Sequence, residues 1–101
     1  MTDVKIDARK AAEGRIHELI VLLRQQPPTA PLDAMIKECE ALARAIGAFH
    51  MEGIRFRMFN VDRTLAKGML PIPAEAAGIF AEARHNLEAA GFQTRSHQAP
   101  G

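Results

Sequence analysis

The sequence predicts an all-α protein of three antiparallel helices, over about residues 3–26, 32–67 and 73–90. Apart from Pro100, the prolines fall in two groups, at residues 27–31 and 71–73. A proline removes a backbone donor and disfavours helix in the residue before it, so both groups mark helix boundaries. Between them, apolar residues recur at three- and four-residue spacing, which is the period of one helix face.

The first predicted helix has one apolar stripe, with most charged residues off it. The stripe consists of Ala12, Ile16, Leu19, Ile20 and Leu23. Asp3 and Asp7 are both acceptable N-caps, which leaves the start of this helix open.

The second predicted helix is the longest. Pro31 suits a first turn, and Asp33 places negative charge where the helix dipole favours it. The apolar period then continues to Leu65 without a proline. Gly47 and Gly53 each cost about 1 kcal/mol relative to alanine inside a helix. We predict an unbroken helix over 32–67, with a break near Gly53 as the alternative.

The third predicted helix begins near Pro73 and Glu75, and Gly91 is a suitable left-handed C-cap. Phe92 follows in the position that often packs back onto such a cap. We therefore predict one helical domain over residues 1–92 and a flexible C-terminal tail over residues 93–101.

Composition limits the class of protein. The 101 residues are 48% hydrophobic and 25% charged, which is ordinary for one globular domain. No run approaches the ~20 apolar residues that span a bilayer, and the first 15 residues resemble no secretory signal. We expect a soluble, cytoplasmic protein with no membrane partner. The single cysteine, Cys39, excludes a disulfide within the chain and a cysteine-rich zinc site.

The length of the second helix predicts a homodimer. At 1.5 Å per residue it would reach ~54 Å, well beyond its two neighbours. Ile54, Met58, Val61 and Leu65 then form a surplus apolar stripe that a second copy would cover, completing a helical bundle. The alternative is a monomer with a broken second helix, folded as a four-helix bundle.

The C-terminal half of this helix is also basic. Residues 53–68 hold four cations against Asp62 alone, a local charge of +3, in a chain whose net charge is only +1. We predict the interaction surface at Ile54, Arg55, Met58, Phe59, Val61, Arg63, Leu65 and Lys67. Basic residues interleaved with aromatics can also bind single-stranded nucleic acid, but the nearly neutral chain makes nucleic acid an unlikely partner.

Two pairs of polar residues are candidate ligand sites. On a continuous helix His50 and Arg57 fall near the centre of the apolar face, where they would hold an anionic ligand or simply be hydrogen-bonded. Glu82 and His85 form a Glu-x-x-His step, a weak metal-site candidate, since a di-iron site needs a second such step. Glu13 and His17 are one turn apart and also occur together by chance in charged helices. We predict no metal and no cofactor.

No catalytic motif is present. The sequence has no glycine-rich phosphate loop and no nucleophile elbow, and Cys39 lies on the apolar stripe, where a thiol is inert. The leading hypothesis is a non-enzymatic homodimer that acts as a protein-interaction or accessory module, with another protein as a further partner. The alternatives are a small-ligand or metal-binding helical bundle and a weak nucleic-acid binder through residues 53–68.

Overall fold

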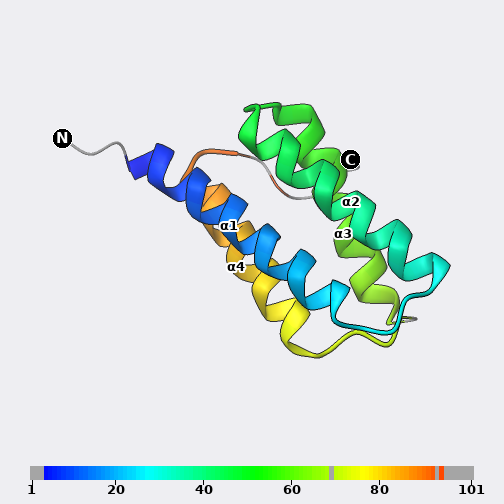
Figure 1. Ribbon diagram of the computed structural model, residues 1–101. Helices are drawn as coiled ribbons and strands as arrows, with labels where there is room; N and C mark the ends of the chain where they lie inside the picture. Colours follow the sequence, from blue (N-terminus) through cyan, green and yellow to red (C-terminus); the bar gives the residue numbers. More distant parts are fainter. Residues whose placement is uncertain (1–3, 69, 93, 95–101) are drawn as a thin grey trace.

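Four helices make up the computed structural model, which describes residues 4–68, 70–92 and 94, with side chains from residue 7 onward. They are α1 (Val4–Arg24), α2 (Ala30–Gly47), α3 (Met51–Lys67) and α4 (Glu75–Ala89). Figure 1 shows α1 and α4 side by side, and α2 and α3 as a second pair. The all-α prediction is confirmed. None of the described helices is long and apolar enough to cross a membrane.

The prediction of three helices is wrong, because the expected helix over 32–67 is broken. α2 ends at Gly47 and α3 begins at Met51. The break is a Schellman motif, in which two backbone bonds reach back over the last helical turn. The His50 N–H donates to the Ala45 carbonyl at 3.0 Å, and the Phe49 N–H donates to the Ile46 carbonyl at 3.2 Å. The alternative of a broken second helix is therefore confirmed for the described residues.

Phe49 occupies the left-handed position of this motif, with a φ of 58°. Glycine usually fills that position, because a side chain there crowds the backbone at a cost of roughly 1–2 kcal/mol. The same two bonds end α4, where Gly91 takes the position with a φ of 95°. The predicted glycine cap at Gly91 is confirmed. At Phe49 the sequence carries no such glycine, which is why the break was not predicted there.

Gly53, the expected site of a break, lies instead inside the first turn of α3. The His50 side chain caps this helix, as its Nδ1 accepts a hydrogen bond from the Gly53 N–H at 2.8 Å. A Cβ atom at residue 53 would lie 2.6 Å from that nitrogen. Gly53 therefore makes room for the cap rather than interrupting the helix.

The core lies where α1 packs against α2 and α4, and where α2 packs against α3. It takes the whole predicted stripe of α1 together with the apolar faces of the other three helices. Its larger fully buried members are Ile16, Leu19, Leu23, Leu42, Ile46, Ile54, Met58, Val61 and Leu87. At 25 cal/mol per Å², burying each such side chain contributes about 1.5–3 kcal/mol.

The other helix ends are closed by local caps. Thr29 caps α2 through its Oγ1, which accepts from the Leu32 N–H at 3.1 Å, and Pro31 lies in the first turn as expected. Gly68 ends α3 with a φ of 63°. α1 and α4 match their predicted bounds to within two residues, because one proline group follows the C-terminal end of α1 and the other precedes the N-terminal end of α4.

The predicted tail over residues 93–101 falls outside the described residues except for Thr94. That residue is only 1% exposed. Arg84 of α4 donates to its carbonyl oxygen at 2.8 Å and to its Oγ1 at 3.1 Å. Arg84 also makes an ion pair of 3.3 Å with Asp62 of α3, so one arginine links α4, α3 and the segment after α4.

Candidate functional site

The predicted ligand pair, His50 and Arg57, is not buried on an apolar face. His50 is exposed and is committed to capping α3. Arg57 is half-buried and donates to both carboxylate oxygens of Glu38 on α2, at 3.0 and 3.1 Å. The expected burial is wrong because it assumed one continuous helix, and the break changes the face on which His50 lies. Ligand binding by either residue stays a prediction.

The predicted interaction surface divides into a buried and an exposed part. Ile54, Met58 and Val61 are fully buried in the chain's own core. The break lets α3 fold back along α2, so these side chains are covered without a second copy. Of the remaining members, Arg55, Phe59 and Leu65 are half-buried, whereas Arg63 and Lys67 are exposed.

The opposite side of α3 carries Phe59 and Arg63 of the predicted interaction surface together with Glu52 and Phe56, which the prediction did not include. We define the outer face of α3 as Glu52, Phe56, Phe59 and Arg63, which are spaced by four, three and four residues. At 100° per residue they lie on one side of the helix, roughly opposite the buried face. Glu52, Phe56 and Arg63 are exposed and Phe59 is half-buried. The four- and three-residue spacing is the sequence signal that would have added Glu52 and Phe56 to the predicted surface.

α2 and α4 contact the two flanks of α3. On one flank, Asn60 donates to the same Glu38 carboxylate as Arg57, at 2.8 Å, which ties α3 to α2. On the other flank, Asp62 pairs with Arg84 of α4. The outer face lies between these two flanks and points away from the core.

Two exposed apolar side chains, Phe49 and Met51, lie at the turn between α2 and α3. Phe49 and Met51 are 55% and 49% exposed. The Arg9 guanidinium of α1 lies 4.1 Å from the centroid of the Phe49 ring, and the Phe92 ring lies 6.4 Å away. Arg9 is itself nearly buried and donates to the Ile46 carbonyl at 3.1 Å. The Phe49 ring is therefore held in a fixed position although much of it faces solvent.

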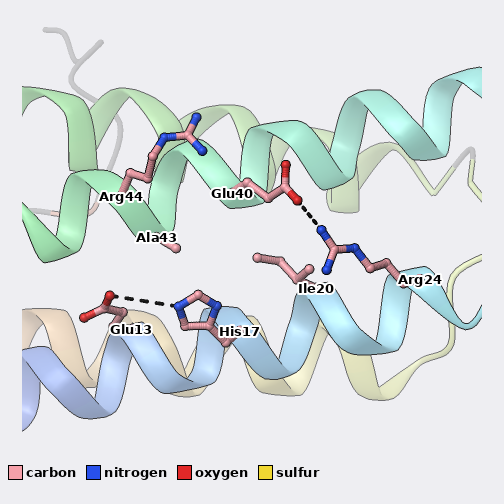
Figure 2. A pocket seen from close by; sticks show the side chains of 7 residues that line it. All are labelled: Glu13, His17, Ile20, Arg24, Glu40, Ala43 and Arg44. Atoms are coloured by element: carbon pink, nitrogen blue, oxygen red, sulfur yellow. Dashed lines mark hydrogen bonds and ion pairs between the residues drawn. The ribbon is translucent and has the colours of Figure 1, made fainter.

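A groove of about 380 Å³ runs between α1 and α2. Figure 2 shows Arg24 and Glu40 meeting across it at one end, and Glu13 beside His17 at the other, at 3.9 Å. Between these polar ends the floor is formed by Ile20 and Ala43. Most of the charge in this groove is already compensated within the protein.

A second groove of about 380 Å³ lies between α2 and the C-terminal half of α3. Pro31, Met35 and Leu70 give it an apolar lining, and Arg63 and Lys67 contribute its cations. Its one carboxylate, Glu38, is held by Arg57 and Asn60. This groove adjoins the exposed part of the predicted interaction surface.

The weak metal candidates, Glu82 and His85, lie together in a shallow surface groove on α4. Glu82 makes an ion pair of 3.1 Å with Arg15 of α1 rather than pointing toward a further ligand. Within residues 4–68, 70–92 and 94 there is no group of three or more histidine, cysteine or acidic residues placed to hold a metal ion.

Cys39 lies in the core, as the sequence predicts. Burial raises the pKa of its thiol from 9.0 to about 12, and the neighbouring Glu38 and Glu40 carboxylates add to the rise. A thiol with such a high pKa stays protonated at neutral pH and is a poor nucleophile.

The basic segment over residues 53–68 offers less free charge than its composition suggests. Arg57 is neutralised by Glu38, and Arg55 lies 4.0 Å from Glu52. Among the described residues, Arg63 and Lys67 are the cations of this segment that have no ion pair. Two cations make a small electrostatic footprint for nucleic acid.

No protein-family model matches the chain, and no curated protein or solved structure matches it significantly.

Proposed function

We propose that this chain is a non-enzymatic protein-interaction module that works as a homodimer, with another protein as a further partner. One observation carries the proposal. Among the described residues, Phe49 in the turn before α3 and Met51 and Phe56 in α3 are large apolar residues that are about half exposed, and they lie within eight residues of sequence. Of the described residues, Val21 of α1 is the one other large apolar residue that is exposed.

The composition of this region supports an interface. Phenylalanine, methionine and arginine are enriched in protein–protein interfaces, where a few such residues carry most of the binding energy. The Phe49 ring is pre-positioned by Arg9 and Phe92, so little conformational freedom would be lost when a partner covers it. Phe49 also keeps a left-handed backbone conformation that glycine would adopt without strain, and backbone strain of this kind is concentrated at functional sites.

Self-association is tested by sedimentation velocity over a range of about 5 to 500 µM, which covers the affinities of small interfaces. We expect a concentration-dependent shift from one copy to two. Phe56→Gln should weaken this shift, while Val21→Gln, at a side chain equally exposed but on α1, should leave it unchanged. A single-copy species across the whole range would contradict the homodimer.

The second candidate is a small-ligand binder, and the observation that favours it is the α1–α2 groove with His17 and Arg24 at its edges. His17 and Arg24 already contact Glu13 and Glu40, so a ligand would have to displace those contacts, whereas Arg44 at the same groove has no ion pair with a described residue to displace. Two-dimensional amide NMR spectra with added inorganic phosphate or citrate test this candidate. Saturable shifts confined to α1 and α2 would favour it over the interaction module.

A further inference from the structure

We propose that the groove between α2 and the C-terminal half of α3 binds a small carboxylate with an apolar body, of the size of a medium-chain fatty acid. The apolar body lies against Met35 and Leu70, and the carboxylate lies between Arg63 and Lys67. This site goes beyond the proposed interaction module, and it neither requires nor excludes the homodimer.

The groove has the dimensions of a small-ligand site. Its volume is about 380 Å³, which lies toward the lower end of the usual range for ligand pockets. The lining comes from residues 31, 34, 35 and 38 of α2 and from residues 60, 63, 64 and 67 of α3. Each set covers two helical turns, or about 10 Å of helix. A helix from a partner protein would extend past both ends, whereas a short ligand fits within this length.

Apolar groups line the α2 side of the groove and the end near the start of α2. Pro31 and Ala34 are exposed, and Met35 lies beside them, nearly buried. Leu70, which follows the end of α3, is half-buried. A hydrocarbon chain placed here would remove its own surface and that of the groove from water, which favours binding.

The α3 side of the groove supplies two cations. Arg63 and Lys67 are exposed, lie one helical turn apart, and make no ion pair with any described residue. The Arg63 guanidinium lies 5.3 Å from the centroid of the Phe59 ring. Such a contact uses the face of the guanidinium and leaves its charge and the N–H donors at its edge for an anion. A carboxylate between the two side chains can therefore accept hydrogen bonds from both.

The one carboxylate that lines the groove does not cancel this charge. Arg57 donates to both oxygens of Glu38 and Asn60 donates to one, at 2.8–3.1 Å. Arg57, Arg63 and Lys67 together carry three positive charges against the one negative charge of Glu38, which leaves +2. The groove therefore favours an anion over a cation or a neutral ligand of the same shape.

The combination of an apolar wall and a pair of cations selects the class of ligand. A small polar anion would use the cations but leave the apolar wall in water. A neutral hydrocarbon would cover the wall but leave the cations without a partner. A carboxylate on an apolar chain satisfies both walls, and its two oxygens match the donors of a guanidinium.

Octanoate is the probe, read out by two-dimensional amide NMR. We expect saturable shifts of the amide signals in residues 31–38 and 60–68, with a dissociation constant on the order of 1 mM for so small a ligand. Octylammonium has the same chain and the opposite charge, and it should bind at least about fivefold more weakly. Acetate has the same head group without the chain, and its shifts should not saturate.

Matched variants test each wall of the groove. Arg63→Gln with Lys67→Gln should raise the dissociation constant for octanoate by about fivefold or more, whereas Lys10→Gln, at an exposed cation of α1, should leave it unchanged. Ala34→Leu fills the apolar side and should raise it by about fivefold or more. Ala11→Leu, at an exposed alanine of α1, should not. All these positions are exposed, and the spectra of the free variants check that the fold is kept.

The outcomes decide the proposal. Octanoate shifts that centre on the α2–α3 groove and weaken in both groove variants support the site. The site is overturned if octanoate does not saturate up to about 20 mM, if octylammonium binds equally well, or if the shifts centre on the α1–α2 groove. Binding that is unchanged by either groove variant also overturns it. The oligomeric state is measured separately by sedimentation velocity, so failure of this site and failure of the homodimer are distinguishable.

Discussion

His50 and Gly53 are fitted to one another at the start of α3: the imidazole Nδ1 accepts the Gly53 N–H at 2.8 Å, and a Cβ at residue 53 would lie 2.6 Å from the same nitrogen. The cap exists because residue 53 has no side chain. The break between α2 and α3 therefore depends on one residue that accepts the hydrogen bond and another that leaves space for it.

Gly53→Ala should fail to stabilise the protein, although alanine is the better helix former. The ring of His50 would have to move away, which removes a cap worth about 1 kcal/mol and offsets the roughly 1 kcal/mol that alanine gains in a helix interior. We expect a free energy of unfolding that is unchanged or lower by up to about 1 kcal/mol, measured by urea denaturation.

Gly78→Ala is the matched control, because Gly78 lies inside α4 and a Cβ there meets nothing within 4 Å. This substitution should raise the free energy of unfolding by about 0.5–1 kcal/mol. Equal stabilisation at both glycines would show that the fit between His50 and Gly53 has no energetic importance.

At position 49, glycine should give a more stable protein than alanine, whereas alanine is the more stabilising residue at an ordinary helical position. Both Phe49→Gly and Phe49→Ala lose the contacts of the ring with Arg9 and Phe92, so their difference isolates the backbone. At a φ of 58° we expect Phe49→Gly to be the more stable of the two by about 1 kcal/mol. Thermal and urea denaturation of the pair measure this directly, and a more stable alanine variant would contradict the left-handed conformation.

The sequence was informative where chemistry is local. The proline groups and the stripe of α1 defined α1 and α4 to within two residues, and Thr29, Pro31 and Gly91 took up the helix-end positions that their chemistry favours. The break before α3 was not local in this sense. Ala48, Phe49 and His50 contain neither proline nor glycine, and Phe49 continues the apolar period of α2, so only the flanking Gly47 and Gly53 indicate a break in the sequence.

The candidate site depended on that error. His50 and Arg57 share one apolar face only if a single continuous helix contains both residues. The break places His50 before the start of α3, so the two residues do not share such a face. Ile54, Met58 and Val61 were correctly identified as apolar, but the sequence could not indicate that the same chain would cover them. Phe59 and Arg63 of the predicted interaction surface lie on the side of α3 away from its buried face, but the spacing alone does not indicate which side of the helix faces the core.

Cys39 should make stability depend on pH in the alkaline range. Its pKa is raised from 9.0 to about 12 in the folded chain, chiefly by burial. Well below pH 9 the thiol is protonated in both the folded and the unfolded chain, so its full contribution to the free energy of unfolding is present. Between pH 9 and 12 the unfolded chain loses the proton and the folded chain keeps it, so the free energy of unfolding falls as pH rises.

The difference between the original chain and Cys39→Ala isolates this contribution from other groups that titrate above pH 9. The stability advantage of the original chain should shrink by about 1.4 kcal/mol between pH values of about 8 and 10, as one pKa unit corresponds to that energy. Urea denaturation at the two pH values measures it. An advantage that is constant with pH would mean that the thiol is not shielded from solvent in the folded state.

Arg84 should be the most sensitive charged residue of those described, because it is nearly buried and its hydrogen bonds join three segments. Arg84→Met keeps much of the side chain's volume but leaves the Thr94 carbonyl oxygen and Oγ1 without their donor and removes the ion pair with Asp62. Losing a charged partner from a buried position typically costs about 2–4 kcal/mol.

Asp62→Asn removes only the half-exposed end of the same network and should cost less than about 1 kcal/mol. Urea denaturation ranks the two variants. If Asp62→Asn were as costly as Arg84→Met, the stabilisation would come from the α3–α4 ion pair rather than from the hydrogen bonds to Thr94.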